Sequence, residues 1–245
     1  MPDMHPAPDI SDLRPDLQSR RPAAPPPQRP PVATAWLQTH SGGAFDLLLP
    51  TRDAVRLGDI AHSLARIARF LGHTVGGQIW SVADHSLLVA DLVRLQPAEH
   101  TPSALLLAAL LHDAHEAYLG DVIRPVQDLI RARAPRFLDI WADTVFSVQS
   151  VIHAAIGLPT VLPASWIDRI HAADRAALAI EHRDVMAPGH DWNDPLPPDG
   201  QPPFAVWHGI RSAETRWIIA VQANIAARHA LPAAREWEAE TDGHD

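Results

Sequence analysis

The sequence predicts an all-α fold, a compact helical bundle preceded by a short extended or hairpin-like segment. Hydrophobic residues make up 47% of the 245-residue chain, which is typical of a globular protein with a sizeable core. From about residue 59 onward, capping residues and glycine or proline stops delimit apolar stretches of helical length. Alternating patterns typical of strands are scarce. Together these observations favour helices packed around one core.

The chain divides into a central domain and two tails. Residues 1–33 are rich in proline and predict a disordered segment that cannot bury enough surface to fold. Residues 34–230 are predicted to form the folded domain, and residues 231–245 an acidic C-terminal tail.

The domain is expected to begin with the extended or hairpin-like segment, over residues 34–58. Gly42 and Gly43 mark a turn within it, and Pro50 marks a break.

Helix starts and stops follow in order. Asp59 is expected to cap a helix that continues to a stop at Gly72. Trp80 or Ser81 opens a second helix, which runs through Leu95.

The later helices are delimited mainly by proline and glycine. Thr101 and Pro102 start a helix that runs to about Leu119 and ends at Gly120. The remaining elements are a helix over 135–156, a helix from Pro163 to Met186, a proline-rich loop over 186–203 and a last helix from Ser212 to Ala230.

Composition excludes several classes of protein. The formal net charge of −9 argues against a nucleic-acid polymer as the main partner. The absence of cysteine removes disulfides and thiolate metal sites and fits a reducing cytoplasm. No apolar run reaches 18 residues, and no secretory signal is evident, so we expect a cytoplasmic protein that does not span a membrane.

The stretch LLHDAHEAYLGDVIRP places ionisable side chains where the pattern indicates a core. Such groups are costly to bury unless they are paired or hold a metal. His112 and Asp113 are adjacent, and Glu116 lies four residues after His112 on the same helical face. Asp121 follows Gly120, where the chain can fold back toward that face. These side chains could therefore share one cavity.

Two further helices offer ligands for a metal. His85 lies on an otherwise apolar helix, and Asp174 lies among small alanines that allow close approach. Together with His112 and Asp113 they give two imidazoles and two carboxylates. Such a set suits one divalent transition metal, Mn, Fe, Co, Ni or Zn, with Mg as a further candidate.

The order H … HD … D on successive helices resembles the HD phosphohydrolase superfamily. Within it, HDAHEAYLGD is similar to the pattern HDA-x-E-x-x-x-GD of the 5′-deoxynucleotidases and small nucleotide phosphohydrolases. The resemblance covers about residues 36–185. It implies an HD-domain helical bundle, with His85, His112, Asp113 and Asp174 as the metal ligands.

The resemblance also implies roles for other residues. Glu116 and Asp121 match the acidic residues that handle protons or orient the attacking water. Arg69 and Phe70 match an arginine and an aromatic residue that hold phosphate and meet the base or sugar.

Two other side chains are candidate substrate contacts. Arg66 competes with Arg69 as a phosphate ligand, and His73 lies in the loop that follows Arg69. The other nearby histidines, His115, His153 and His171, form no evident second motif, so we expect one metal.

The resemblance implies metal-dependent hydrolysis of a small nucleotide, foremost a (deoxy)nucleoside 5′-monophosphate to nucleoside and orthophosphate. One alternative enzyme releases triphosphate from a (deoxy)nucleoside triphosphate, and another is a phosphodiesterase. A third alternative is a non-catalytic nucleotide sensor, while a purely structural protein leaves the HD residues unexplained. Related deoxynucleotidases form dimers, which makes a homodimer a further expectation.

Overall fold

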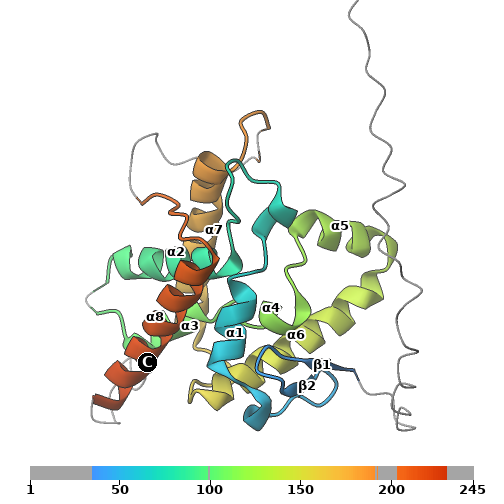
Figure 1. The fold of residues 1–245 in the computed structure, drawn as a ribbon, viewed down its shortest axis with the longest axis vertical. Coiled ribbons are helices and arrows are strands. Elements are labelled where there is room, and N and C mark those ends of the chain that lie inside the picture. Colours follow the sequence, from blue (N-terminus) through green and yellow to red (C-terminus); the bar gives the residue numbers. More distant parts are fainter. Residues whose placement is uncertain (1–34, 99, 191, 193–202, 231–245) are drawn as a thin grey trace, which may run out of the picture. The chain divides into compact units, whose positions relative to one another are not determined.

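The computed structural model describes residues 35–98, 100–190, 192 and 203–230 (Figure 1). The two predicted tails, residues 1–33 and 231–245, lie outside the described residues, as does most of the predicted loop over 186–203.

The described part of the chain is mostly helical, which confirms the predicted fold class. Its helices are α1 (Leu57–Leu64), α2 (Val82–Leu95), α3 (Ser103–Leu110), α4 (Glu116–Leu119), α5 (Arg124–Arg133), α6 (Pro135–Ala155), α7 (Ala164–Val185) and α8 (Ile210–Ala230). Two short 3-10 turns, η3 (Arg52–Ala54) and η4 (Arg69–Gly72), flank α1. None of the helices described is long and apolar enough to cross a membrane.

The N-terminal segment is a small hairpin, as predicted. Strand β1 (Trp36–Gln38) pairs antiparallel with β2 (Ala44–Asp46), with Leu37 opposite Phe45. Gly42 has φ 84°, a left-handed conformation that glycine adopts without steric cost and that closes the turn. The buried ring of Phe45 stacks on Tyr118 with centroids 3.8 Å apart, so the hairpin is anchored against α4.

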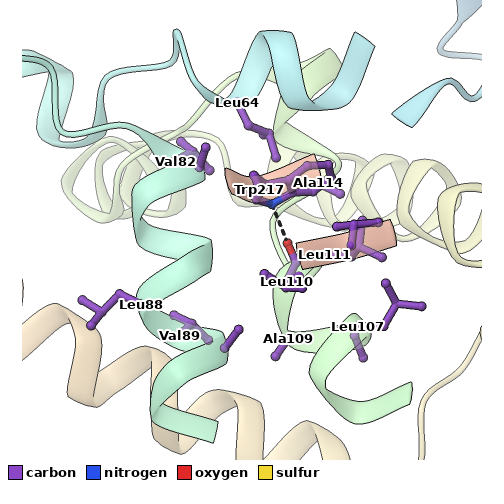
Figure 2. Packing of buried hydrophobic residues seen from close by; sticks show 14 of the residues in the cluster. Leu64, Val82, Leu88, Val89, Leu107, Ala109, Leu110, Leu111, Ala114 and Trp217 are labelled. Carbon is purple, nitrogen blue, oxygen red and sulfur yellow. Dashed lines mark hydrogen bonds between the residues drawn. The ribbon is translucent and has the colours of Figure 1, made fainter. Parts of the chain in front are cut away.

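The core surrounds α2 and α3. Helix α2 packs mainly on α7 and α3, and α3 packs mainly on α8 (Figure 1). Every residue of α3 after Ser103 is buried, because this helix is apolar all round and has neighbours on each side. Figure 2 shows Trp217 of α8 seated over the end of α3, where its indole nitrogen donates a hydrogen bond to the Leu110 carbonyl at 3.0 Å.

Helix α2 begins where the sequence predicts. Ser81 Oγ accepts from the backbone N–H of Asp84 at 3.1 Å, and Asp84 Oδ2 accepts from the N–H of Ser81 at 3.1 Å. This reciprocal capping box satisfies two orphan donors of the helix start. It also fixes the first turn of α2, which carries His85.

The prediction for Asp59 is wrong. Helix α1 begins at Leu57, and the buried carboxylate of Asp59 accepts from the N–H and Oγ of Ser41 at 2.7 and 2.8 Å. Asp59 therefore caps the hairpin turn and not its own helix. The helix also ends at Leu64, because the chain turns there to pair Ala68 with Ser81.

The helix predicted from Thr101 to Leu119 is interrupted. Helix α3 ends at Leu110, turns follow over residues 111–115, and α4 begins at Glu116. The interruption is stabilised from α6, because Gln149 Nε2 donates to the Leu111 carbonyl at 2.6 Å and Gln149 Oε1 accepts from the N–H of His115 at 3.1 Å. The predicted stop is correct, since Gly120 has φ 78°.

The later helices follow the prediction closely, with one addition. Helices α6, α7 and α8 match the expected ranges within two residues at each end. The sequence does not predict helix α5, which carries Pro125 in its first turn, where a missing N–H costs nothing.

Candidate metal site

Four of the predicted site residues converge in space. His85 comes from α2, Asp174 from α7, and His112 and Asp113 from the turns between α3 and α4. His85 Nε2 lies 3.3 Å from His112 Nε2 and 3.1 Å from Asp174 Oδ1. Asp113 Oδ2 lies 3.1 Å from His112 Nε2 and 3.6 Å from His85 Nε2. These donor atoms therefore point at one common location.

The other ring nitrogens of both histidines are occupied. His85 Nδ1 lies 2.8 Å from Glu181 Oε1, and His112 Nδ1 lies 2.8 Å from the Ala109 carbonyl. Since a carboxylate and a carbonyl only accept, both Nδ1 atoms carry a proton and donate it. In the neutral rings the lone pairs then lie on the two facing Nε2 atoms. Two bare nitrogens at 3.3 Å repel one another unless a proton or a metal ion lies between them, so the donor set fits a bound cation.

The charges around these atoms stabilise a cation. Burial by itself would lower the pKa of His112, but Asp113 and Asp174 raise it to about 9. Burial opposes ionisation of Asp113, yet His112 and His85 hold the pKa of that carboxyl well below its usual range. The site is therefore electronegative enough to bind a proton or a metal ion.

The ligand atoms range from buried to accessible. The His85 side chain has no exposed surface, whereas 44% of the Asp174 side chain is exposed. The site is thus fixed at its base by α2 and open to solvent beside α7.

Glu181 lies behind His85 as a fully buried carboxylate. Besides His85 Nδ1, it accepts from Trp80 Nε1 at 2.7 Å and from Arg69 Nη2 at 2.9 Å. Burial alone would raise its pKa, but the charges of His85 and Arg69 and these hydrogen bonds lower the pKa of Glu181 to about 2. Glu181 is therefore an anion near neutral pH.

Arg69 lies close to the site. Its N–H donates to the Trp80 carbonyl at 2.9 Å, which ties the segment before α2 to the start of that helix. Burial would lower the pKa of its guanidinium, but Glu181, Asp113 and Asp121 raise it above the usual value. Arg69 is thus a permanent cation among the acidic side chains.

Phe70 adopts an unusual backbone conformation next to Arg69. Phe70 and the following Leu71 have φ of 54° and 55°, the left-handed region that costs non-glycine residues on the order of 1–3 kcal/mol each. The ring of Phe70 lies 5.2 Å from the Arg69 guanidinium carbon and 5.6 Å from the Trp192 ring. The contact of Phe70 with a base or sugar remains a prediction.

The structure does not bring Arg66 and His73 to the four ligands. Arg66 Nη1 donates to Glu214 Oε2 on α8 and to the His62 carbonyl, each at 2.7 Å. His73 is exposed at the end of η4, where its N–H donates to the Phe70 carbonyl at 3.0 Å. No side-chain contact between either residue and the ligand atoms is present in the described part of the chain.

Glu116 and Asp121 flank the site with raised pKa values. Burial, together with the negative charges of Asp113 and Asp121, raises the pKa of Glu116 to about 9. Its buried Oε2 has no hydrogen-bond partner among the described residues. Burial and Asp113 raise the pKa of half-buried Asp121, against the opposing charge of Arg69. The environment of Glu116 therefore keeps a proton on this carboxyl near neutral pH.

Comparison with known proteins gives two clear relatives, and no family model matches the chain. An uncharacterized protein of Rhodobacter capsulatus is 40% identical over 152 residues, which cover 62% of this chain and 73% of that protein. The uncharacterized protein YfdR of Escherichia coli is 32% identical over 151 residues, covering 62% of this chain and 72% of YfdR. The chain belongs to the same family as YfdR.

In this YfdR relative, a second group of side chains lies beside the first. Asp113, His115 and Glu116 offer ligand atoms that all lie within 4.8 Å of one another. His115 Nδ1 lies 3.3 Å from Gln149 Oε1. Asp113 is one of the four ligands and also belongs to this second group. Its carboxylate is chemically able to bind two ions, although the sequence favours a single metal.

A cavity of this family member has none of the four ligands in its lining. It has a volume of about 410 Å³ and is bounded by the hairpin turn, α1 and α4. Its lining includes Arg66, the stacked rings of His40 and His62, whose centroids are 3.4 Å apart, and Tyr118.

The sequence reasoning missed Glu181. One signal was available, because Glu181 follows Asp174 by seven residues and therefore lies on the same face of α7. Its partners Arg69, Trp80 and His85 all come from an earlier part of the chain, which no local pattern could reveal.

Proposed function

We propose that this chain is an HD-type phosphohydrolase that cleaves a (deoxy)nucleoside 5′-monophosphate to nucleoside and orthophosphate with one divalent transition metal. The observation that carries the proposal is the pair of Nε2 atoms, on His85 and His112, that face one another at 3.3 Å beside Asp113 and Asp174. The resemblance of HDAHEAYLGD to nucleotide phosphohydrolases supports the same reaction.

When bound by these four side chains, the divalent cation would polarise a phosphoryl oxygen and lower the pKa of water. The chain's own residues orient the substrate. Arg69 interacts electrostatically with Asp113 and Asp121, so it would neutralise charge that grows on the phosphoryl oxygens during attack.

Glu116 and Asp121 are the residues that would transfer protons. Water forms the new P–O bond, the ester P–O bond breaks, and the leaving 5′-oxygen needs a proton. Glu116, whose pKa is raised to about 9, is suited to donate that proton as a general acid. Burial and Asp113 raise the pKa of Asp121 while the charge of Arg69 opposes that rise, and this carboxyl is the candidate to accept the proton of the attacking water.

The basic groups favour a monophosphate over a triphosphate. Arg66, which would have contacted a further phosphate group, forms an ion pair with Glu214 at 2.7 Å. Arg69 then remains as the predicted phosphate ligand, and exposed Arg124, which follows the turn at Gly120 and Asp121, is the further basic group that a triphosphate would call on.

Phosphate analysis against a nucleotide panel tests the proposal. The panel holds mono-, di- and triphosphates, ribo and deoxy, each with Mn, Co, Mg, Ni or Zn and with chelator. We expect orthophosphate from monophosphates, lost with chelator and in Asp113→Ala. Asp91→Asn is the matched control, because Asp91 is exposed on the surface of α2 and pairs there with exposed Arg94.

The other outcomes separate the alternatives. Tripolyphosphate from triphosphates would replace the proposal with a triphosphohydrolase. Bound metal and nucleotide without release of any product would point to a sensor.

A further inference from the structure

Glu181 has the most complete set of partners of any carboxylate described near the site. Its side chain has no exposed surface, and acidic residues are almost never buried in this way unless they are paired. Its oxygens accept from Trp80 Nε1, His85 Nδ1 and Arg69 Nη2 at 2.7, 2.8 and 2.9 Å. His85 belongs to the proposed metal site and Arg69 to the proposed phosphate site, and both donate to the same carboxylate.

We infer that Glu181 is a positioning residue that serves both halves of the site: it orients His85 toward the cation and holds Arg69 at the phosphate. The inference rests on the proposed function for its phosphate half. Its cation half requires only that the four ligands bind a metal ion.

The first half concerns the ring of His85. An imidazole has two tautomers, and only the one protonated on Nδ1 presents a bare Nε2 to a cation. Glu181 Oε1 accepts from Nδ1 at 2.8 Å, which selects this tautomer and prevents rotation of the ring. A carboxylate in this position also makes the imidazole a stronger ligand, and such outer partners are worth roughly 10- to 100-fold in metal affinity.

The second half concerns the guanidinium of Arg69. A free arginine side chain samples many rotamers, and ordering it opposes anion binding. Glu181 Oε2 fixes one end of the guanidinium at 2.9 Å. Arg69 Nε is buried and has no hydrogen-bond partner among the described residues, so this donor remains for an acceptor such as a phosphate oxygen.

Glutamine at this position cannot reproduce these contacts. An amide has one oxygen and one NH₂ group, whereas Glu181 uses both oxygens as acceptors. If the NH₂ faced Arg69, two donors would oppose each other. If it faced His85, Nδ1 would have to accept, and the proton would move to Nε2, where the cation binds.

The experiment compares the full chain with its Glu181→Gln variant. Isothermal titration with Mn²⁺ alone measures cation affinity, and titration of the Mn²⁺-loaded protein with orthophosphate measures anion affinity. We expect the variant to lose roughly 10- to 100-fold in Mn²⁺ affinity and roughly tenfold or more in orthophosphate affinity.

Trp80→Phe is the matched control for a merely structural role. It removes the third donor to Glu181 and leaves those of His85 and Arg69 in place. We expect Trp80→Phe to lower the melting temperature. Its Mn²⁺ affinity should stay within about threefold of the wild type, since the contacts of His85 and Arg69 with Glu181 are kept.

The outcomes separate this inference from the proposed function. A folded Glu181→Gln variant with wild-type affinity for both ions overturns the inference and leaves the proposed function standing. Weakened Mn²⁺ binding in a protein that hydrolyses no nucleotide supports the cation half while the proposed function fails. If the wild-type chain binds no Mn²⁺, both are overturned.

Glu181→Asp decides the matter if the glutamine variant does not fold. The shorter side chain keeps the charge but cannot reach His85 and Arg69 together. We expect Mn²⁺ affinity between those of the wild type and a ligand variant, and an unchanged affinity would overturn the inference.

Discussion

Asp174 Oδ1 on α7 lies 3.1 Å from Nε2 of His85 on α2, so two helices that pack together each contribute a ligand atom to one location. Because α2 and α7 form part of the core, the geometry of this pair is set by the fold and not by a loop. The consequences of this arrangement can be measured one residue at a time.

Asp174→Asn should weaken cation binding, because it replaces a charged ligand with a neutral amide. The loss of a partner behind a ligand costs roughly 10- to 100-fold in metal affinity, and we expect at least that loss here. The fold should survive, because 44% of this side chain is exposed. Calorimetric titration with Mn²⁺ checks the affinity, and Asp91→Asn on the surface of α2 serves as the control. Equal affinity in wild type and Asp174→Asn would remove Asp174 from the ligand set.

Glu116→Gln should reduce turnover by roughly 10²- to 10⁴-fold, because glutamine cannot deliver a proton to the leaving oxygen. Cation affinity should stay within a few-fold, which a parallel Mn²⁺ titration measures. If affinity falls together with turnover, Glu116 acts as a ligand with Asp113 and His115, which the spacing of these three side chains also permits.

Gln149→Leu should destabilise the turns that carry His112 and Asp113. It would leave the Leu111 carbonyl and the His115 N–H without their partner, at about 1–3 kcal/mol for each buried group. Urea unfolding should therefore show a loss of stability of about 2–6 kcal/mol. Thr144→Ala on the exposed side of α6 should change stability by less than about 0.5 kcal/mol, and a similarly small loss in Gln149→Leu would refute the role given to Gln149.

His153 should make the fold sensitive to mild acid. Burial lowers the pKa of His153 to about 4, below the value of 6.5 expected in the unfolded chain, and Gln149 donates to its Nε2 at 2.8 Å. The unfolded chain therefore binds the proton first as the pH falls. This contribution to stability is full above about pH 6.5 and is lost progressively down to about pH 4.

Urea unfolding at pH 7 and pH 5 measures this effect. Between pH 7 and pH 5 the wild type should lose about 2 kcal/mol more of its free energy of unfolding than His153→Leu. The difference arises because leucine at this position cannot take up a proton. Identical losses in the two proteins would show that His153 does not titrate in this way.

The sequence is sufficient to predict the parts that depend on residue type and local spacing. Ser81 precedes an apolar run and has Asp84 three residues later, so the start of α2 is predictable. His85, His112, Asp113 and Asp174 are polar residues in apolar helical surroundings, and burial requires them to have partners.

The parts that depend on distant partners could not be predicted. The run from Ser103 to Leu119 is helical by every local rule, yet it breaks where Trp217 and Gln149 supply donors to its carbonyls. Asp59 resembles a helix cap, but its carboxylate binds Ser41 of the hairpin turn. Tertiary contacts override local propensity in both cases.

The stoichiometry of cation binding tests the central claim most directly. Equilibrium dialysis of the full chain against Mn²⁺, followed by elemental analysis, should give one ion per chain, lost in His85→Ala and in Asp113→Ala and retained in Asp91→Asn. The absence of bound ion in the wild type, or an ion that persists in both ligand variants, would contradict the assignment of these side chains as a metal site.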